Sequence, residues 1–191
     1  MKRVLTAAVL LSSLVVAGAA FAQAGPYIGG SIGQSNYKFD CSGFSCDKSD
    51  FGFKVFGGYM FMPYLGAEAH YVDLGKITLN PSTVPGIGTV SGDIKSSGFG
   101  LSLLAQYPIE QFAIFGKVGF TYLDTKVSGS ISGLGSASDS ESATNVSYGI
   151  GGAYNFNKQL SARLEWERFR AEFQGEKEDV DLISIGIAYR F

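Results

Sequence analysis

Charged side chains within segments that read as β-strands are the residues of this sequence that could do chemistry. By their place in an alternating pattern, the following are predicted to point to a common interior: Lys54, Glu68, His70, Lys117, Arg163, Glu165, Glu167 and Arg190. Opposite charges in a narrow, low-dielectric interior should pair, because removing one partner of a buried ion pair costs about 3–5 kcal/mol. We therefore predict a network in which two carboxylates, Glu68 and Glu165, bridge three cations, namely Lys117, Arg163 and Lys54.

His70 is the only histidine, and a histidine can act as a general base. A lipid A deacylase or acyltransferase would need a His with a nearby Ser on the outer face of the protein. The alternation predicts that His70 points inward beside Glu68, and the sequence has no His-x-Ser motif. We therefore expect a hydrogen-bonding role for His70, no catalytic residues and no enzyme, and a lipid-modifying enzyme is the least favoured function.

Two cysteines, Cys41 and Cys46, lie close together in a polar stretch. An exported protein meets an oxidising periplasm, so we expect a disulfide between them. Two thiols without further Cys or a nearby His do not form a tetrahedral metal site, and their spacing is not that of a redox C-x-x-C pair. No metal and no cofactor are expected.

In the segments that carry these charged residues, apolar and polar side chains alternate with a period of two residues. From Phe51 to Phe61 the odd positions are apolar and aromatic, whereas the even positions are mixed, small and include Lys54. The same alternation recurs to the last residues of the chain. Aromatics towards the ends of the apolar face are typical of the girdles that face lipid in a membrane barrel. Small residues on the other face suit a narrow interior that is filled from all sides.

Three tight turns alternate with four longer polar links, at 38–49, 76–93, 124–143 and 170–179. Short periplasmic turns and longer external loops are the arrangement of outer-membrane barrels. Counting strands gives eight, at 26–37, 50–61, 64–75, 94–107, 111–123, 144–156, 159–169 and 180–191. The sequence thus predicts an all-β protein, an eight-stranded antiparallel up-and-down transmembrane β-barrel with both termini in the periplasm. The Gly- and Ser-rich run 128–142 is predicted to be a loop.

The N-terminal residues predict export. Lys2 and Arg3 precede an apolar run from Val4 to Gly18, and Ala20-Phe21-Ala22 offers small residues at a cleavage site, which is the pattern of a signal peptide at 1–22. A single membrane anchor is the less favoured alternative. Residues 23–191 would form the barrel domain, with no periplasmic domain after it. Removing Lys2 and Arg3 changes the formal net charge from −2 to −4. The sequence therefore shows no excess of basic residues of the kind that binds nucleic acid.

Large aromatic residues are predicted to anchor the barrel at the membrane interface, where amphipathic rings suit the headgroup zone. Trp166 is expected to face lipid. The others are expected near the periplasmic rim: Tyr59, Tyr64, Tyr107, Tyr154, Tyr189 and Phe191.

Four segments in order resemble the OmpA-like eight-stranded outer-membrane barrel family, over essentially the whole mature chain. They are Gly25 to Gly30, Leu65 to Tyr71, Leu160 to Trp166 and Ile185 to Phe191. The resemblance implies a lumen charge network that acts as a plug or gate, and recognition of the last strand by the outer-membrane assembly machinery. Outer-membrane lipid and lipopolysaccharide are the expected surroundings. A fold hosts many functions, so the resemblance does not by itself assign one.

The leading hypothesis is an integral outer-membrane protein with a structural role in envelope integrity and exposed surface loops. The alternatives are a surface adhesin or host-interaction protein that binds an extracellular ligand through those loops, and a small gated ion pore. An eight-stranded interior is just filled by side chains, which favours a closed polar core over a pore.

Overall fold

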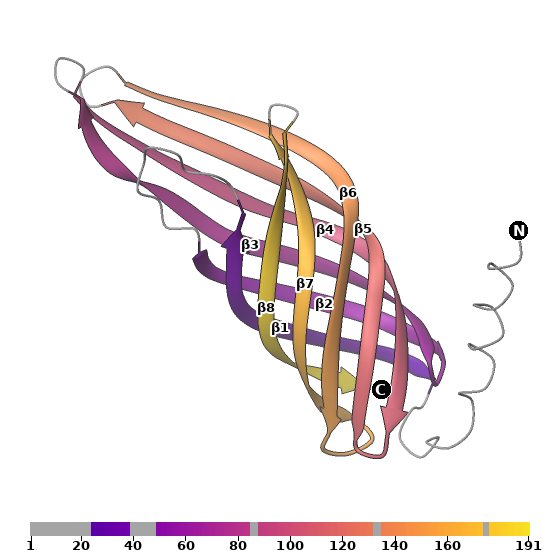
Figure 1. Ribbon diagram of the computed structural model, residues 1–191. Coiled ribbons are helices and arrows are strands. Elements are labelled where there is room, and N and C mark those ends of the chain that lie inside the picture. The colour runs from indigo at the N-terminus through magenta and orange to yellow at the C-terminus, as the bar shows by residue number, and fades with distance from the viewer. Residues whose placement is uncertain (1–23, 39–48, 85–87, 132–134, 174–175) are drawn as a thin grey trace, which may run out of the picture.

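The computed structural model is a closed barrel of eight antiparallel strands, each hydrogen-bonded to the next and β1 to β8 (Figure 1). It describes residues 24–38, 49–84, 88–131, 135–173 and 176–191. The strands are β1 (Gly25–Tyr37), β2 (Ser49–Met62), β3 (Leu65–Val84), β4 (Gly88–Ile109), β5 (Phe112–Ile131), β6 (Gly135–Asn155), β7 (Leu160–Phe173) and β8 (Glu176–Arg190). The predicted fold class is therefore confirmed.

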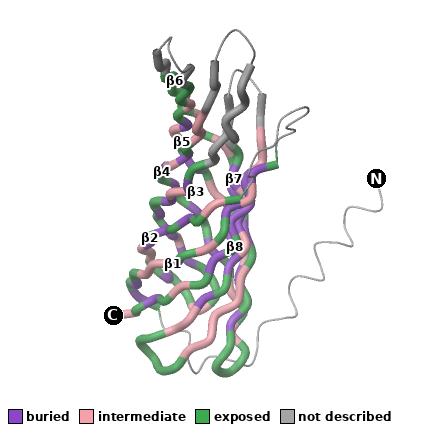
Figure 2. Tube along the Cα trace, turned by 90° about the vertical axis from the view of Figure 1, so that its left-hand side faces the viewer, coloured by how far each residue is buried: buried purple, intermediate pink, exposed green. Residues whose placement is uncertain are grey.

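Predicted and observed strands agree to within two residues at the end of the barrel that carries the three short connections. We call this the turn end and the opposite one the far end. Within the barrel portion of the strands, more buried and more exposed residues alternate (Figure 2). This alternation arises because successive side chains of a strand point to opposite faces. The predicted signal peptide at 1–22 and the predicted Cys41–Cys46 disulfide lie outside the described residues.

The prediction of long loops at the far end is wrong for three of the four links. Most of 76–93 and of 124–143, including most of the Gly- and Ser-rich run 128–142, forms strand. There β3 to β6 continue as a four-stranded sheet beyond β1, β2, β7 and β8 (Figure 1). The link at 170–179 is also shorter than predicted, because β7 reaches Phe173 and β8 begins at Glu176. Of 38–49, the described ends are Lys38 and Ser49.

A break in the β3–β4 register marks where this sheet leaves the barrel. The pairing shifts between Asp73 and Lys76, and the β2–β3 pairing ends at Asp73. Gly75 has a φ of 79°, a region that glycine adopts readily and other residues rarely do. An added Cβ there would lie 2.7 Å from the Phe51 carbonyl oxygen. Gly75 is therefore required where β3 stops pairing with β2 and continues to pair with β4.

The outside of the barrel is apolar, with aromatic rings at two levels. Near the turn end the exposed rings include Tyr59, Phe61, Tyr64, Tyr107, Phe112, Tyr189 and Phe191. At the second level they include Phe51, Phe53, Tyr71, Phe99, Tyr122 and Tyr148. Between them lie exposed aliphatic side chains such as Ile28, Leu103, Val118, Leu164 and Ile185. An apolar band between two aromatic girdles is the surface of a transmembrane barrel.

Two of the predicted anchors are half-buried. Tyr154 packs against Phe112 with tilted rings at a centroid distance of 4.9 Å, at the turn end. Trp166 lies against Tyr148, at a centroid distance of 6.0 Å, and so belongs to the far girdle. In the parts of the chain that the structure describes, no helix is long and apolar enough to cross a membrane.

Candidate functional site

The barrel interior has three layers. Towards the far end lies an apolar cluster of Tyr37, Val72, Leu74, Leu123, Phe169, Val180 and Leu182. Towards the turn end lies a second cluster of Tyr27, Phe56, Met60, Leu104, Phe115 and Ala188. Between the two lies a group of buried charged side chains. Apolar residues on both sides shield most of this group from bulk water, which strengthens the electrostatic interactions within it.

The charged layer joins strands from opposite sides of the barrel. Lys117 of β5 lies 3.1 Å from Glu68 Oε1 of β3, and 2.8 Å from both Glu165 Oε2 and Glu167 Oε1 of β7. Lys54 of β2 also forms ion pairs with Glu165 and Glu167. Each lysine is thus held by two or three carboxylates.

Arg163 completes the layer on the side of the turn end. Its Nη1 lies 2.8 Å from Glu68 Oε2, and its Nε lies 2.8 Å from Glu165 Oε1. The guanidinium carbon lies over the rings of Phe56 and Phe115, at 4.4 and 4.6 Å from their centroids. Both contacts are in the range of cation–π interactions.

Glycines make room for these two rings. An added Cβ at Gly29 or Gly151 would lie 2.4 Å from the Cζ atom of Phe56 or Phe115, respectively. Such a distance is far below normal contact, so a side chain at either position would displace a ring from Arg163. The small inward residues that the sequence shows therefore serve the packing of this layer.

The layer holds equal numbers of opposite charges. Three carboxylates, Glu68, Glu165 and Glu167, face three cations, Lys54, Lys117 and Arg163, and all six side chains are buried. Pairing each charge with an opposite one offsets much of the cost of burying it. The arrangement can hold strands together across the lumen, and an ion that crossed it would have to displace these ion pairs.

His70 lies beside the charged layer. Its Nε2 is 3.1 Å from Thr121 Oγ1, which in turn is 2.8 Å from Ser147 Oγ. Its ring packs edge-on against Phe169 at a centroid distance of 5.9 Å. These contacts give His70 a hydrogen-bonding and packing environment within the buried interior.

Of the eight interior residues proposed from the sequence, Arg190 lies apart from the charged layer. It is half-buried and lines a pocket at the turn end together with Arg163. Sequence reasoning missed Tyr27, whose hydroxyl donates a hydrogen bond to Glu68 Oε2 at 3.0 Å. The in–out alternation of β1, in which Tyr27 is buried and Ile28 exposed, is the signal that could have found it.

A second ion pair, also missed from the sequence, lies just beyond the far girdle. Arg168 of β7 donates two hydrogen bonds to Asp181 of β8, from Nε to Oδ1 at 2.6 Å and from Nη2 to Oδ2 at 2.8 Å. Lys38 Nζ lies 3.0 Å from the same carboxylate. The hydrogen bonds from Arg168 are the main cause that lowers the pKa of Asp181 below its ordinary value.

This pair predicts a stability change in acid. Because the folded chain holds the pKa of Asp181 below that of the unfolded chain, the carboxylate stabilises the fold above a pH of about 4. That contribution is lost as the pH falls through the lowered pKa. We expect Asp181→Asn to lower the urea midpoint at pH 6 and to have a smaller effect at pH 3. Equal effects at both pH values, or an equal pH dependence in the exposed control Asp139→Asn, would contradict this.

Comparison with known proteins agrees with the barrel. A family model described as "Outer membrane protein beta-barrel domain" matches residues 5–191. Outer membrane protein A of Yersinia pseudotuberculosis is 29% identical over 96% of this chain and 55% of that protein. The same protein of Shigella flexneri is 26% identical over 91% of this chain and 52% of that protein. The chain thus spans about half the length of these relatives.

Solved structures share the fold. Ail, the attachment invasion locus protein of Yersinia pestis, has a TM-score of 0.60 at 21% identity, covering 88% of this chain and 100% of that chain. Neisserial surface protein A has a TM-score of 0.63 at 11% identity, covering 87% of this chain and 97% of that chain. A further structure of Ail is a complex with the heparin analogue sucrose octasulfate. At these identities the likeness shows the fold alone.

Proposed function

The chain belongs to the outer membrane protein β-barrel family, and from this we propose that it is a structural component of the Gram-negative outer membrane with a closed interior and an extended sheet at the cell surface. The observation that carries this proposal is the three-layered interior. A neutral charged layer packed between two apolar clusters stabilises the barrel across its width and fills its interior with side chains.

The same proposal fixes an orientation and a route to the membrane. The turn end, with both ends of the barrel domain, faces the periplasm, since short turns there and longer connections outside are the rule for bacterial barrels. Residues 1–22 direct export, and the last strand with Phe191 presents the chain to the assembly machinery. In the oxidising periplasm Cys41 and Cys46 form a disulfide. Lipid and lipopolysaccharide surround the apolar band, and no enzyme activity is proposed.

Planar bilayers test the closed interior. The refolded mature chain should show no stepwise conductance above background, and Lys117→Ala should not create any, because both apolar layers remain in place. The gel shift between unboiled and boiled samples establishes that the variant is folded. Lys126→Ala, which removes an exposed cation beyond the girdle, is the matched control. Conductance steps in Lys117→Ala alone would identify the charged layer as a gate and replace this proposal with the ion pore.

A second candidate function is binding at the cell surface, and the four-stranded sheet of β3 to β6 favours it. This sheet carries main-chain and polar side-chain groups beyond the girdle, and Asp139, Ser140 and Ser142 on β6 are exposed. The segments 38–50, 73–95, 124–141 and 168–181 hold 8 Lys and Arg against 13 Asp and Glu. A cationic partner is therefore favoured, in contrast to the polyanionic heparin analogue bound to Ail.

One variant separates the two roles. Shortening the β3–β4 and β5–β6 hairpins to the girdle leaves every residue of the charged layer in place. In a strain that lacks the protein, this variant should restore resistance to detergent as the full chain does, if the role is structural. A surface-binding role predicts instead that detergent resistance is unaffected by deletion of the protein, and that attachment to a cationic surface is lost when the hairpins are shortened.

A further inference from the structure

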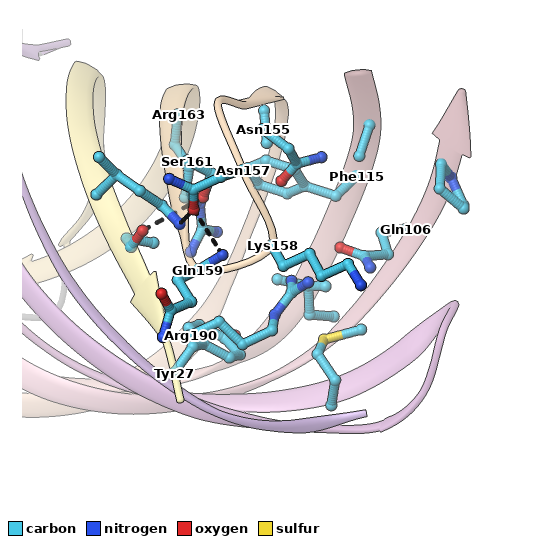
Figure 3. A pocket seen from close by; sticks show the side chains of 17 residues that line it. Tyr27, Gln106, Phe115, Asn155, Asn157, Lys158, Gln159, Ser161, Arg163 and Arg190 are labelled. Carbon is cyan, nitrogen blue, oxygen red and sulfur yellow. Dashed lines mark hydrogen bonds between the residues drawn. The ribbon is translucent and has the colours of Figure 1, made fainter. Parts of the chain in front are cut away.

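A small pocket with several polar side chains lies at the turn end, and Arg163 of the charged layer is one of the residues that line it (Figure 3). Its volume is about 40 Å³. That is room for roughly three water molecules, since each water molecule needs a cavity volume on the order of 10–15 Å³. Exposed residues of the β6–β7 turn, among them Lys158 and Gln159, form part of its wall, so solvent reaches it from the turn end.

The wall of this pocket carries charge of one sign. Two cations outside the charged layer, Arg190 and Lys158, line it together with Arg163 and with neutral groups such as Tyr27 and Asn155. Among the described residues that line it there is no carboxylate. A concave site with low-dielectric walls and one sign of charge raises the local concentration of ions of the other sign.

Arg163 supplies a second and independent observation. Its Nε and Nη1 point to Glu165 and Glu68, whereas its Nη2 is buried and has no hydrogen-bond partner among the described residues. The residue is only 6% exposed. Leaving a buried, charged donor unpaired is costly, so such a group in a native protein points to a partner that the chain itself does not provide.

The guanidinium of Arg163 is held in place before any ligand arrives. Two carboxylates fix one side of it, and the rings of Phe56 and Phe115 enclose its faces. Since Nε and Nη1 are occupied, Nη2 is the donor left for the pocket that Arg163 lines. A fixed donor loses little entropy on binding, which favours a ligand with several acceptor oxygens over loosely held water.

We propose that this pocket binds a small oxyanion of the phosphate class, with Arg163 Nη2 as its innermost donor and Arg190 and Lys158 as cationic side walls. The site itself does not depend on the function proposed above. The proposed orientation adds only that the anion would enter from the periplasm.

Titration of inorganic phosphate into the full mature chain tests the proposal. The chain is refolded in zwitterionic micelles, and heat is measured at constant ionic strength. We expect saturable binding with one site per chain. The double variant Arg190→Gln with Lys158→Gln should weaken it at least tenfold, because both side walls lose their charge. Lys158→Gln alone, in an exposed turn, should weaken it by a smaller factor and guards against a folding defect of the double variant.

The matched control removes two cations at the far end, by Lys126→Gln with Arg170→Gln, and should leave phosphate binding unchanged. Absence of saturable binding, or equal affinity in the double variant and the wild type, would overturn the proposal. Adding an anionic phospholipid to the micelles distinguishes the source. If the lipid alone abolishes phosphate binding in the wild type, a headgroup phosphate and not a free ion occupies the site. These outcomes are independent of the conductance test.

Discussion

Replacing Glu165 by alanine is expected to destabilise the barrel by about 3–5 kcal/mol, the cost of removing one partner from a buried ion pair. Glu165 contacts three cations at once, Lys54, Lys117 and Arg163. Its loss leaves three buried cations with two carboxylates. The measurement is the urea midpoint of protein refolded in lipid vesicles. The folded fraction at each urea concentration is read from the gel shift between unboiled and boiled samples.

The isosteric Glu165→Gln keeps the shape and removes only the charge, so it should also be clearly destabilised. Asp139→Ala removes an exposed carboxylate on β6 and should change the midpoint little, since exposed charges contribute little to stability. A midpoint for Glu165→Ala as high as that of the wild type would show that the charged layer does not contribute to stability, and would remove the main support for a structural role.

Leu103→Arg is the second substitution with a large expected effect. Leu103 is 58% exposed and lies midway along β4 between Phe99 of the far girdle and Tyr107 of the near one. It therefore faces the middle of the bilayer. An arginine on the lipid face at the midplane of a barrel costs about 2–4 kcal/mol. Urea unfolding from lipid vesicles measures this loss.

The control for Leu103→Arg is Ser140→Arg, at an exposed position of β6 beyond the girdle. It should leave the urea midpoint unchanged, because the new charge stays in water. If both substitutions had the same small effect, the apolar band would not be in contact with lipid, and the assignment of the outward residues would fail.

The barrel portion was predictable because one face of each strand meets lipid and the other meets the interior. Phe99, Leu101 and Leu103 alternate with Gly100 and Ser102, so the period of two is visible in the sequence. The continuation of β5 and β6 past the girdle gives no such signal. Both faces of that sheet meet water, as the exposed Ser128, Asp139 and Ser140 show, so neither face selects apolar residues. A polar, Gly- and Ser-rich strand then looks like a loop.

The candidate site was predictable in its members more than in its geometry. The alternation of inward and outward positions along each strand is enough to place Lys54, Glu68 and Lys117 inside. It does not reveal that Glu167 contacts both lysines, because that depends on the relative heights of β2, β5 and β7. Those heights follow from pairing registers around the whole barrel, which a single sequence does not specify. The pocket at the turn end was missed for a related reason. Lys158 lies in a turn, where side chains do not alternate between an inner and an outer face.

The backbone hydrogen bonds of the barrel and those of the β3–β6 sheet beyond the girdle should differ in how readily they open. In the barrel every backbone hydrogen bond lies behind lipid or packed side chains, so amide protons there can exchange only through large-scale unfolding. Beyond the girdle the described residues of β5 and β6 are less covered: Ser128 and Asp139 are exposed, and an added Cβ at Gly129 would meet nothing within 4 Å. Single hydrogen bonds can therefore open locally there. The part of the sheet beyond the girdle is thus also where we expect the chain to be most readily cut by proteases and most tolerant of sequence change.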